Sequence, residues 1–274
     1  MLCDPILIAV WIAVNCGNGN ADMRNYVKED SIVRRIWGNA DTILFIFAGA
    51  SAEFALNKAV DWLYFTGRLP ADPIARLFST VEYARRIVFS RHDAALKAID
   101  QITAIHKNVE ADRGANIPDW AYRDVLYMLI DYSIRAFEAL ERKLNDNEKA
   151  EVFSVFNDVG LRMGIQELPD SYTAWVADRE KHLESDLACS NLTYDLYKQY
   201  HMHLGSVRYE ILKKVQSMIC PEYVIRLLPF KEISLFPPIL GLYKLFRFCK
   251  LDSIIKAIVL PGQYQQQIHA LNVK

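Results

Sequence analysis

The residues WAYRDVLYMLIDYSIRAFEAL, from Trp120 to Leu140, decide the fold class. Apolar and aromatic side chains occupy most of the circumference of a helix drawn through them, which is typical of a helix at the centre of a domain. Pro118 and Asp119 stand directly before the stretch, and both residue types favour a helix start. We therefore expect a buried central helix over about residues 119–143.

Helical periodicity continues along nearly the whole chain, and strand signals are few. The 11 glycines and 10 prolines stand mostly where helices would begin or end. Helices are expected at residues 41–66, 73–90, 93–111, 119–143, 147–163, 170–185, 192–218, 239–249 and 251–259. The sequence therefore predicts an all-α fold, with a single multi-helix, bundle-like domain built around the central helix.

The chain divides into three parts. Residues 30–230 should form one helical domain, because no linker interrupts them. Residues 1–29 are an N-terminal segment of uncertain order, in which the apolar run 6–14 favours a packing segment over a targeting signal, since no Lys or Arg precedes it. Residues 231–274 are expected to be a helical extension. Its apolar and basic residues at 235–260 would pack on the domain or contact a membrane surface peripherally, and packing is favoured.

Composition narrows the classes of function. Of 274 residues, 52% are hydrophobic, which is enough for a substantial core. The 32 Lys and Arg residues nearly balance the 33 Asp and Glu residues, which argues against nucleic acid as a partner. Five scattered cysteines without a C-x-x-C pair favour a reduced, cytoplasmic setting, with membrane association through 235–260 as a variant.

His106 is the candidate metal ligand. It shares one helical face with Ile99, Ile102 and Val109, so we expect it to be buried. A buried imidazole can hydrogen-bond within the core or bind a metal such as haem iron. The pattern alone favours the core histidine.

Four charged residues form a stripe on the central helix: Asp124, Asp131, Arg135 and Glu138 follow one another at spacings of seven, four and three. Asp131 and Arg135 can pair at i,i+4. If the stripe faces inward its charges must be paired. A structural network is favoured over a cofactor or substrate contact.

Arg76 lies about one helical turn before Ser79 and Thr80, so the three side chains can share a face. They could hold a carboxylate such as a haem propionate. Alternatively, they are a surface arginine beside two hydroxyls, and without further context this interpretation is favoured. Weaker candidates are a histidine pair at 201 and 203 and an acidic pair, Glu53 and Asp61.

Five short motifs, in this order, resemble the superfamily of the MpaB oxygenases and the latex-clearing proteins. They are the apolar helix Leu44–Asp61, Arg76-Leu77-Phe78-Ser79-Thr80, Ile105-His106-Lys107-Asn108-Val109, Trp120 with Ala136-Phe137-Glu138, and Met163-Gly164-Ile165 with Leu168-Pro169. The resemblance covers roughly residues 30–230.

The resemblance implies a helical fold that encloses haem b. It implies His106 as proximal iron ligand and places Arg76 and Thr80, beside Ser79, on the distal or propionate side. From the charged stripe, Asp124 and Arg135 are further candidate cofactor contacts. The implied reaction is oxidative cleavage of a C=C bond in a lipophilic, often isoprenoid, substrate by dioxygen.

The chain departs from the pattern at two places. Ser79 stands where the latex-clearing branch has a distal lysine, and Leu56-Asn57-Lys58 stand where many relatives have His-Pro. Two alternatives therefore remain open. One is a non-catalytic protein that binds a lipid or another hydrophobic small molecule, and the other is a non-haem metal oxygenase with carboxylate ligands.

Overall fold

The computed structural model describes residues 24–67 and 71–230, and within them the secondary structure is helical. The helices are α2 (Ile32–Trp37), α3 (Ala40–Leu56), α4 (Asp61–Phe65), α6 (Pro73–Phe89), α7 (His92–Arg113), α8 (Asp119–Leu140), α9 (Asp146–Met163), α10 (Tyr172–Asp186), α11 (Asn191–Ile219) and α12 (Glu222–Leu227). The all-α prediction is confirmed. The expected helices at 239–249 and 251–259 lie outside the described residues.

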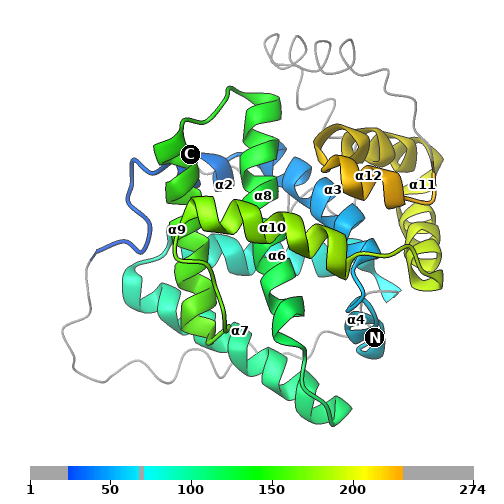
Figure 1. Cartoon of the computed structure of the whole chain (residues 1–274), viewed down its shortest axis with the longest axis horizontal. Helices are drawn as coiled ribbons and strands as arrows, with labels where there is room; N and C mark the ends of the chain where they lie inside the picture. The colour runs from blue at the N-terminus through cyan, green and yellow to red at the C-terminus, as the bar shows by residue number, and fades with distance from the viewer. Residues whose placement is uncertain (1–23, 68–70, 231–274) are drawn as a thin grey trace.

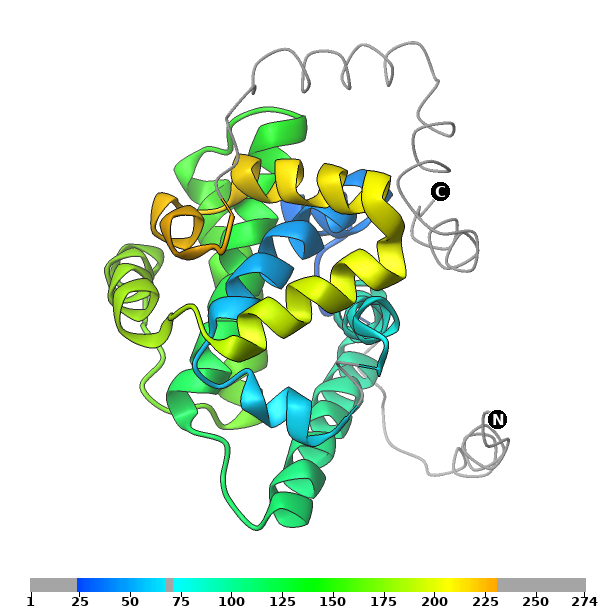
Figure 2. The ribbon, with the colours of Figure 1, turned by 90° about the vertical axis from the view of Figure 1, so that its right-hand side faces the viewer.

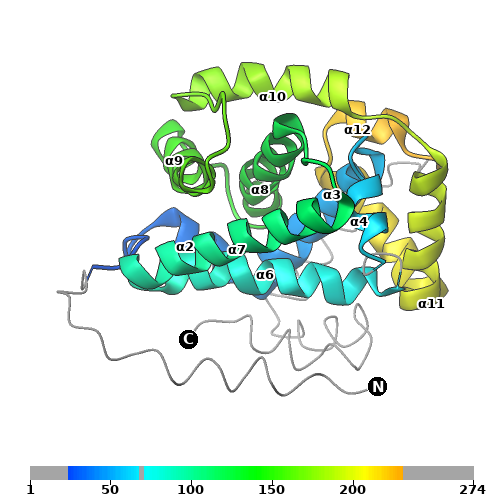
Figure 3. The ribbon, with the colours of Figure 1, turned by 90° about the horizontal axis from the view of Figure 1, so that it is seen from below.

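Helix α8 runs through the middle of the molecule, as the sequence predicted. Seen end-on in Figure 3, α8 and α9 lie between α10 on one side and the α6–α7 pair on the other. Three side chains of α8, those of Tyr127, Ile130 and Tyr132, have no exposed surface. The largely apolar circumference of α8 is therefore explained by neighbours on most of its sides.

Helix α3 packs more closely against α8 than a side chain at the contact would allow. Gly49 is the contact point, where an added Cβ would lie 2.3 Å from ring carbons of Tyr132. The α3 helix begins at Asn39, whose side chain accepts hydrogen bonds from the backbone N–H groups of Asp41 and Thr42. A capped start and a small residue at the crossing thus fix the position of α3.

The prediction of a single helix over 41–66 is wrong, because α3 ends before Asn57 and α4 begins at Asp61. The Asn57 side chain accepts a hydrogen bond from the backbone N–H of Ala59, at 2.8 Å. Backbone groups on either side pair with the end of α10: Lys58 N donates to Asp186 O (2.9 Å) and Ala188 N donates to Leu56 O (2.8 Å). A distant segment therefore satisfies groups that a longer α3 would have bonded internally.

Helix α11 consists of two arms that meet at a bend, although a continuous helix was expected. Gly205 has φ 72° and ψ 165°, a conformation that is almost restricted to glycine. Figure 2 shows the two yellow arms folded toward one another across α3. Within the described residues, no helix combines the length and the apolar character needed to cross a membrane.

Candidate functional site

His106 lies in the C-terminal half of α7 and faces the start of α8. Its Nδ1 lies 2.8 Å from the carbonyl oxygen of Ile102, one helical turn earlier. The Tyr122 ring packs edge-on against the imidazole, with ring centroids 5.2 Å apart. The sequence predicted a buried His106, but its side chain is only half-buried. The reason is that this half of α7 extends beyond the apolar core.

The surroundings of His106 favour its neutral form. Partial burial lowers its pKa below the ordinary value, and the nearby Arg76 charge lowers it further, against the opposing effects of the Ile102 carbonyl and Glu110. A neutral imidazole that donates its Nδ1 proton to a carbonyl keeps the lone pair on Nε2. Nε2 is therefore the atom that could bind a metal.

Arg76, Ser79 and Thr80 form one polar group on α6. The Arg76 guanidinium donates from Nη1 to Ser79 Oγ at 2.9 Å and to Thr80 Oγ1 at 3.2 Å. Both hydroxyls donate in turn to the Arg76 carbonyl. The predicted shared face is present, and Arg76 is close enough to His106 to influence its charge.

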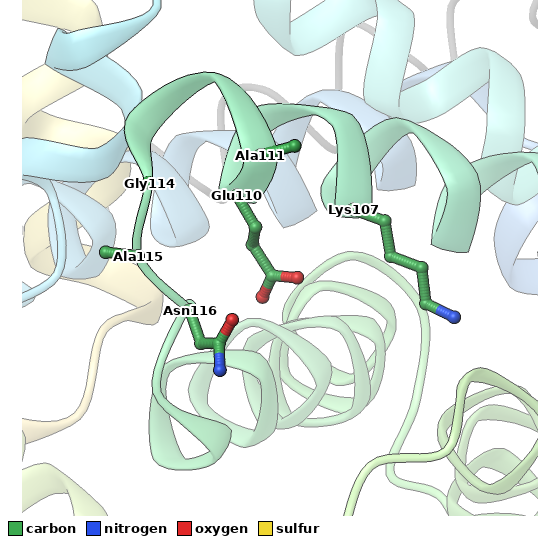
Figure 4. Close-up of a pocket in the computed structure, with 6 residues that line it drawn as sticks. All are labelled: Lys107, Glu110, Ala111, Gly114, Ala115 and Asn116. Atoms are coloured by element: carbon green, nitrogen blue, oxygen red, sulfur yellow. The ribbon is translucent and has the colours of Figure 1, made fainter.

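A polar hollow of about 590 Å³ adjoins this part of α7 (Figure 4). It is lined by Lys107, Glu110, Ala111, Gly114, Ala115 and Asn116. The Tyr122 hydroxyl donates to Glu110 at 3.2 Å, so the ring that packs on His106 also contacts the wall of the hollow. The hollow is open, and its lining combines the polar side chains Lys107, Glu110 and Asn116 with two alanines and a glycine, so it does not enclose an apolar porphyrin face.

The structure places Asp124 and Arg135 in other contacts. Asp124 is buried and accepts hydrogen bonds from Asn57 Nδ2 and His182 Nδ1, each at 2.6 Å. Arg135 donates from Nε to Asp131 at 2.7 Å, which is the expected i,i+4 pair. The predicted structural network on α8 is therefore present.

That network is completed by Arg179 of α10. Its guanidinium donates to both carboxylate oxygens of Glu53, at 2.5 and 2.6 Å, and to Asp131 at 3.2 Å. Tyr132 also donates to Glu53, at 2.9 Å. Burial opposes the Arg179 charge, but Glu53 and Asp131 outweigh it and raise the pKa. Glu53 is thereby explained as an ion-pair partner.

A second cluster at α8 and α10 was missed by the sequence reading. His182 Nδ1 lies 2.6 Å from Asp124 Oδ1 and 3.0 Å from Asp186 Oδ2. Asp124 was considered only as part of the stripe. His182 and Asp186 stand at the i,i+4 spacing of a ligand pair on a helix, and that spacing was the available signal.

The remaining candidates have ordinary partners. Asp61 pairs with Arg113 at 2.6 Å, and the Arg113 guanidinium lies over the Trp62 ring, 4.0 Å from its centroid. His201 Nε2 lies 3.2 Å from Ser206 Oγ, at the bend of α11. Both groups are explained by local structure.

The side chains near His106 fit a haem in their chemistry. A neutral imidazole with its other N–H bound to a carbonyl is the usual state of a metal-ligating histidine. A guanidinium is the usual partner of a carboxylate such as a propionate. His106 and Arg76 are thus the residues that would hold the iron and a propionate.

The comparisons with known proteins identify the family of the chain. No curated protein and no solved structure matched the chain. One family model matched residues 34–238, which include α3 to α12 and every candidate residue above. The chain therefore belongs to the family described as the catalytic domain of the ER-bound oxygenase mpaB/B′ and rubber oxygenase.

Proposed function

We propose that the protein is a haem b-dependent oxygenase that uses dioxygen to cleave a C=C bond of a lipophilic, isoprenoid-type alkene. Family membership supports the reaction class. The observation that carries the haem assignment is the state of His106, whose Nδ1–H···O=C bond leaves Nε2 available beside the Arg76 cation.

Each side chain of the group has a role in this proposal. His106 Nε2 would hold the iron, and the Ile102 carbonyl fixes the imidazole's orientation and tautomer. Arg76 would neutralise a propionate, while Ser79 and Thr80 hold its guanidinium in place. Bound haem would supply dioxygen activation. Asp124 and Arg135 are left out of this site because their side chains bind His182 and Asp131.

The ultraviolet–visible spectrum of protein expressed with added haem tests the assignment. We expect a Soret band in the parent that is lost or shifted in His106→Ala and retained in His201→Ala, a matched histidine exposed on α11. Parent protein that folds but shows no Soret band would rule out the haem site. Loaded protein would then be incubated with isoprenoid alkenes, and carbonyl products would be sought.

The alternative is a non-catalytic protein that binds a lipid or another hydrophobic molecule. Ser79 favours it, since this residue stands where the latex-clearing branch has a lysine and its hydroxyl is already engaged by Arg76. The two functions differ in whether haem co-purifies and whether dioxygen is consumed.

A further inference from the structure

A second set of metal-ligating side chains lies on the other side of α8 from His106. It consists of Asp124 on α8 and of His182 and Asp186, one turn apart on α10. One donor atom from each residue lies within 4.8 Å of the other two. Asp124 and His182 are almost fully buried, and Asp186 is mostly buried.

The backbone around this cluster is fixed before any ligand binds. Residues 57 and 187 form an antiparallel bridge that joins the end of α3 to the end of α10. Asn57 Nδ2 donates to one oxygen of Asp124 and leaves the other oxygen facing His182. A cation would therefore find its ligands already oriented.

The cluster carries more negative than positive charge. Asp178 Oδ2 lies 3.7 Å from His182 Nε2, so three carboxylates surround one imidazole. Within the described residues, no Lys or Arg side chain lies at ion-pair distance from these carboxylates. The Lys58 amine donates to the Ser185 carbonyl instead. Even a protonated His182 would leave the group negative.

The neighbouring turn of α10 shows how this fold balances buried carboxylates when its own residues suffice. There Arg179 and Arg135 face Glu53 and Asp131, two positive charges against two negative ones. Buried charge that lacks such compensation is costly. A bound cation would supply the missing charge at His182.

The ring nitrogen of His182 that would not bind the metal, Nε2, has the kind of partner found in metal sites. Histidines that bind metals through one nitrogen commonly direct the other toward a carboxylate. Here Nδ1 faces Asp124 and Asp186, while Nε2 faces Asp178, which is held by a 2.7 Å hydrogen bond from the Tyr127 hydroxyl. A cation bound to Nδ1 would complete the carboxylate–histidine–metal order that zinc sites use.

We propose that Asp124, His182 and Asp186 bind one divalent transition-metal cation, with Zn²⁺ as the best match to one nitrogen and two oxygen donors. On binding, the Nδ1 proton moves to Nε2 in a neutral imidazole, or to solvent from an imidazolium. The ligand atoms would then lie roughly 3.3–3.6 Å apart, as tetrahedral Zn–N and Zn–O bonds of about 2.0–2.2 Å require. The site is independent of haem.

Calorimetric titration of tag-free, chelator-treated protein with Zn²⁺ and Mn²⁺ tests the proposal. We expect one saturable site that Asp186→Asn and His182→Gln each weaken at least tenfold. Asp100→Asn removes a surface carboxylate paired with Arg162 and should leave affinity unchanged. Absence of a saturable site in the parent, or equal affinity in the variants, would overturn the proposal.

A measurement on the parent alone covers the case in which a variant fails to fold. Histidine ring nitrogens are observed by ¹⁵N NMR while Zn²⁺ is added. The resonances of His182 should move with one equivalent, and those of His106 should not. Movement at His106 or His201 with His182 unchanged would place the cation elsewhere and refute this site. A Soret band plays no part in either result, so the haem proposal stands or falls separately.

Discussion

At the scale of single residues, Arg179 holds the buried polar group together. It is 4% exposed and is the cation shared by Glu53 and Asp131. Replacement by Met would leave both carboxylates buried with one fewer partner, at a cost of about 3–5 kcal/mol. We expect Arg179→Met to lower the free energy of unfolding by this amount in urea denaturation. Arg162→Met, at an exposed ion pair, should change it little, and equal losses would contradict the argument.

The residues that could be predicted from the sequence are those whose partners lie nearby in the chain. The Asp131–Arg135 pair followed from i,i+4 spacing and is confirmed. Arg179 could not be foreseen, because its partner Glu53 lies 126 positions away and meets it only in the folded chain. The contact between His182 and Asp124 could not be foreseen for the same reason, because 58 positions separate the two residues.

At the scale of helices, the α3–α8 crossing depends on Gly49. An alanine Cβ there would meet the Tyr132 ring, which is fully buried and bound to Glu53 and therefore cannot move aside. We expect Gly49→Ala to destabilise the protein by roughly 1–3 kcal/mol or more, measured by urea denaturation. Gly160→Ala is the matched control, since its nearest neighbours are the ends of two leucines. A control as damaging as Gly49→Ala would refute the crossing argument.

Helix α9 begins at a capping box of Asn145 and Glu148, and the structure contains both reciprocal bonds. The Arg142 guanidinium and the Asn145 N–H lower the pKa of Glu148 to about 2. Because this folded pKa is below the unfolded one, the stabilisation is complete above about pH 4.3 and is lost as the pH falls toward 2. We expect NMR to find Glu148 titrating near 2 and Arg142→Ala to raise that value. Titration at the ordinary value in the parent would contradict the contact.

At the scale of the whole molecule, the core is unevenly distributed around the candidate sites. The large apolar cluster includes residues of α3, α8 and α10, whereas α7 is held by a small cluster that includes Ala95, Ala98 and Ile99. A single domain with α8 at its centre could be predicted from periodicity. The loose attachment of the second half of α7 could not be predicted, because its apolar residues have the sequence pattern of core residues. Ile105, for example, is 43% exposed.

This uneven core predicts where the protein opens. Residues 103–113 have few buried contacts, so their amides should exchange with solvent far faster than those of residues 127–137 in α8. If His106 holds the iron, added haem must slow exchange across 103–113 in the parent and leave it unchanged in His106→Ala. Hydrogen exchange read by mass spectrometry distinguishes these cases. Equal protection of α7 and α8 without haem would show that α7 is as firmly packed as the central helix.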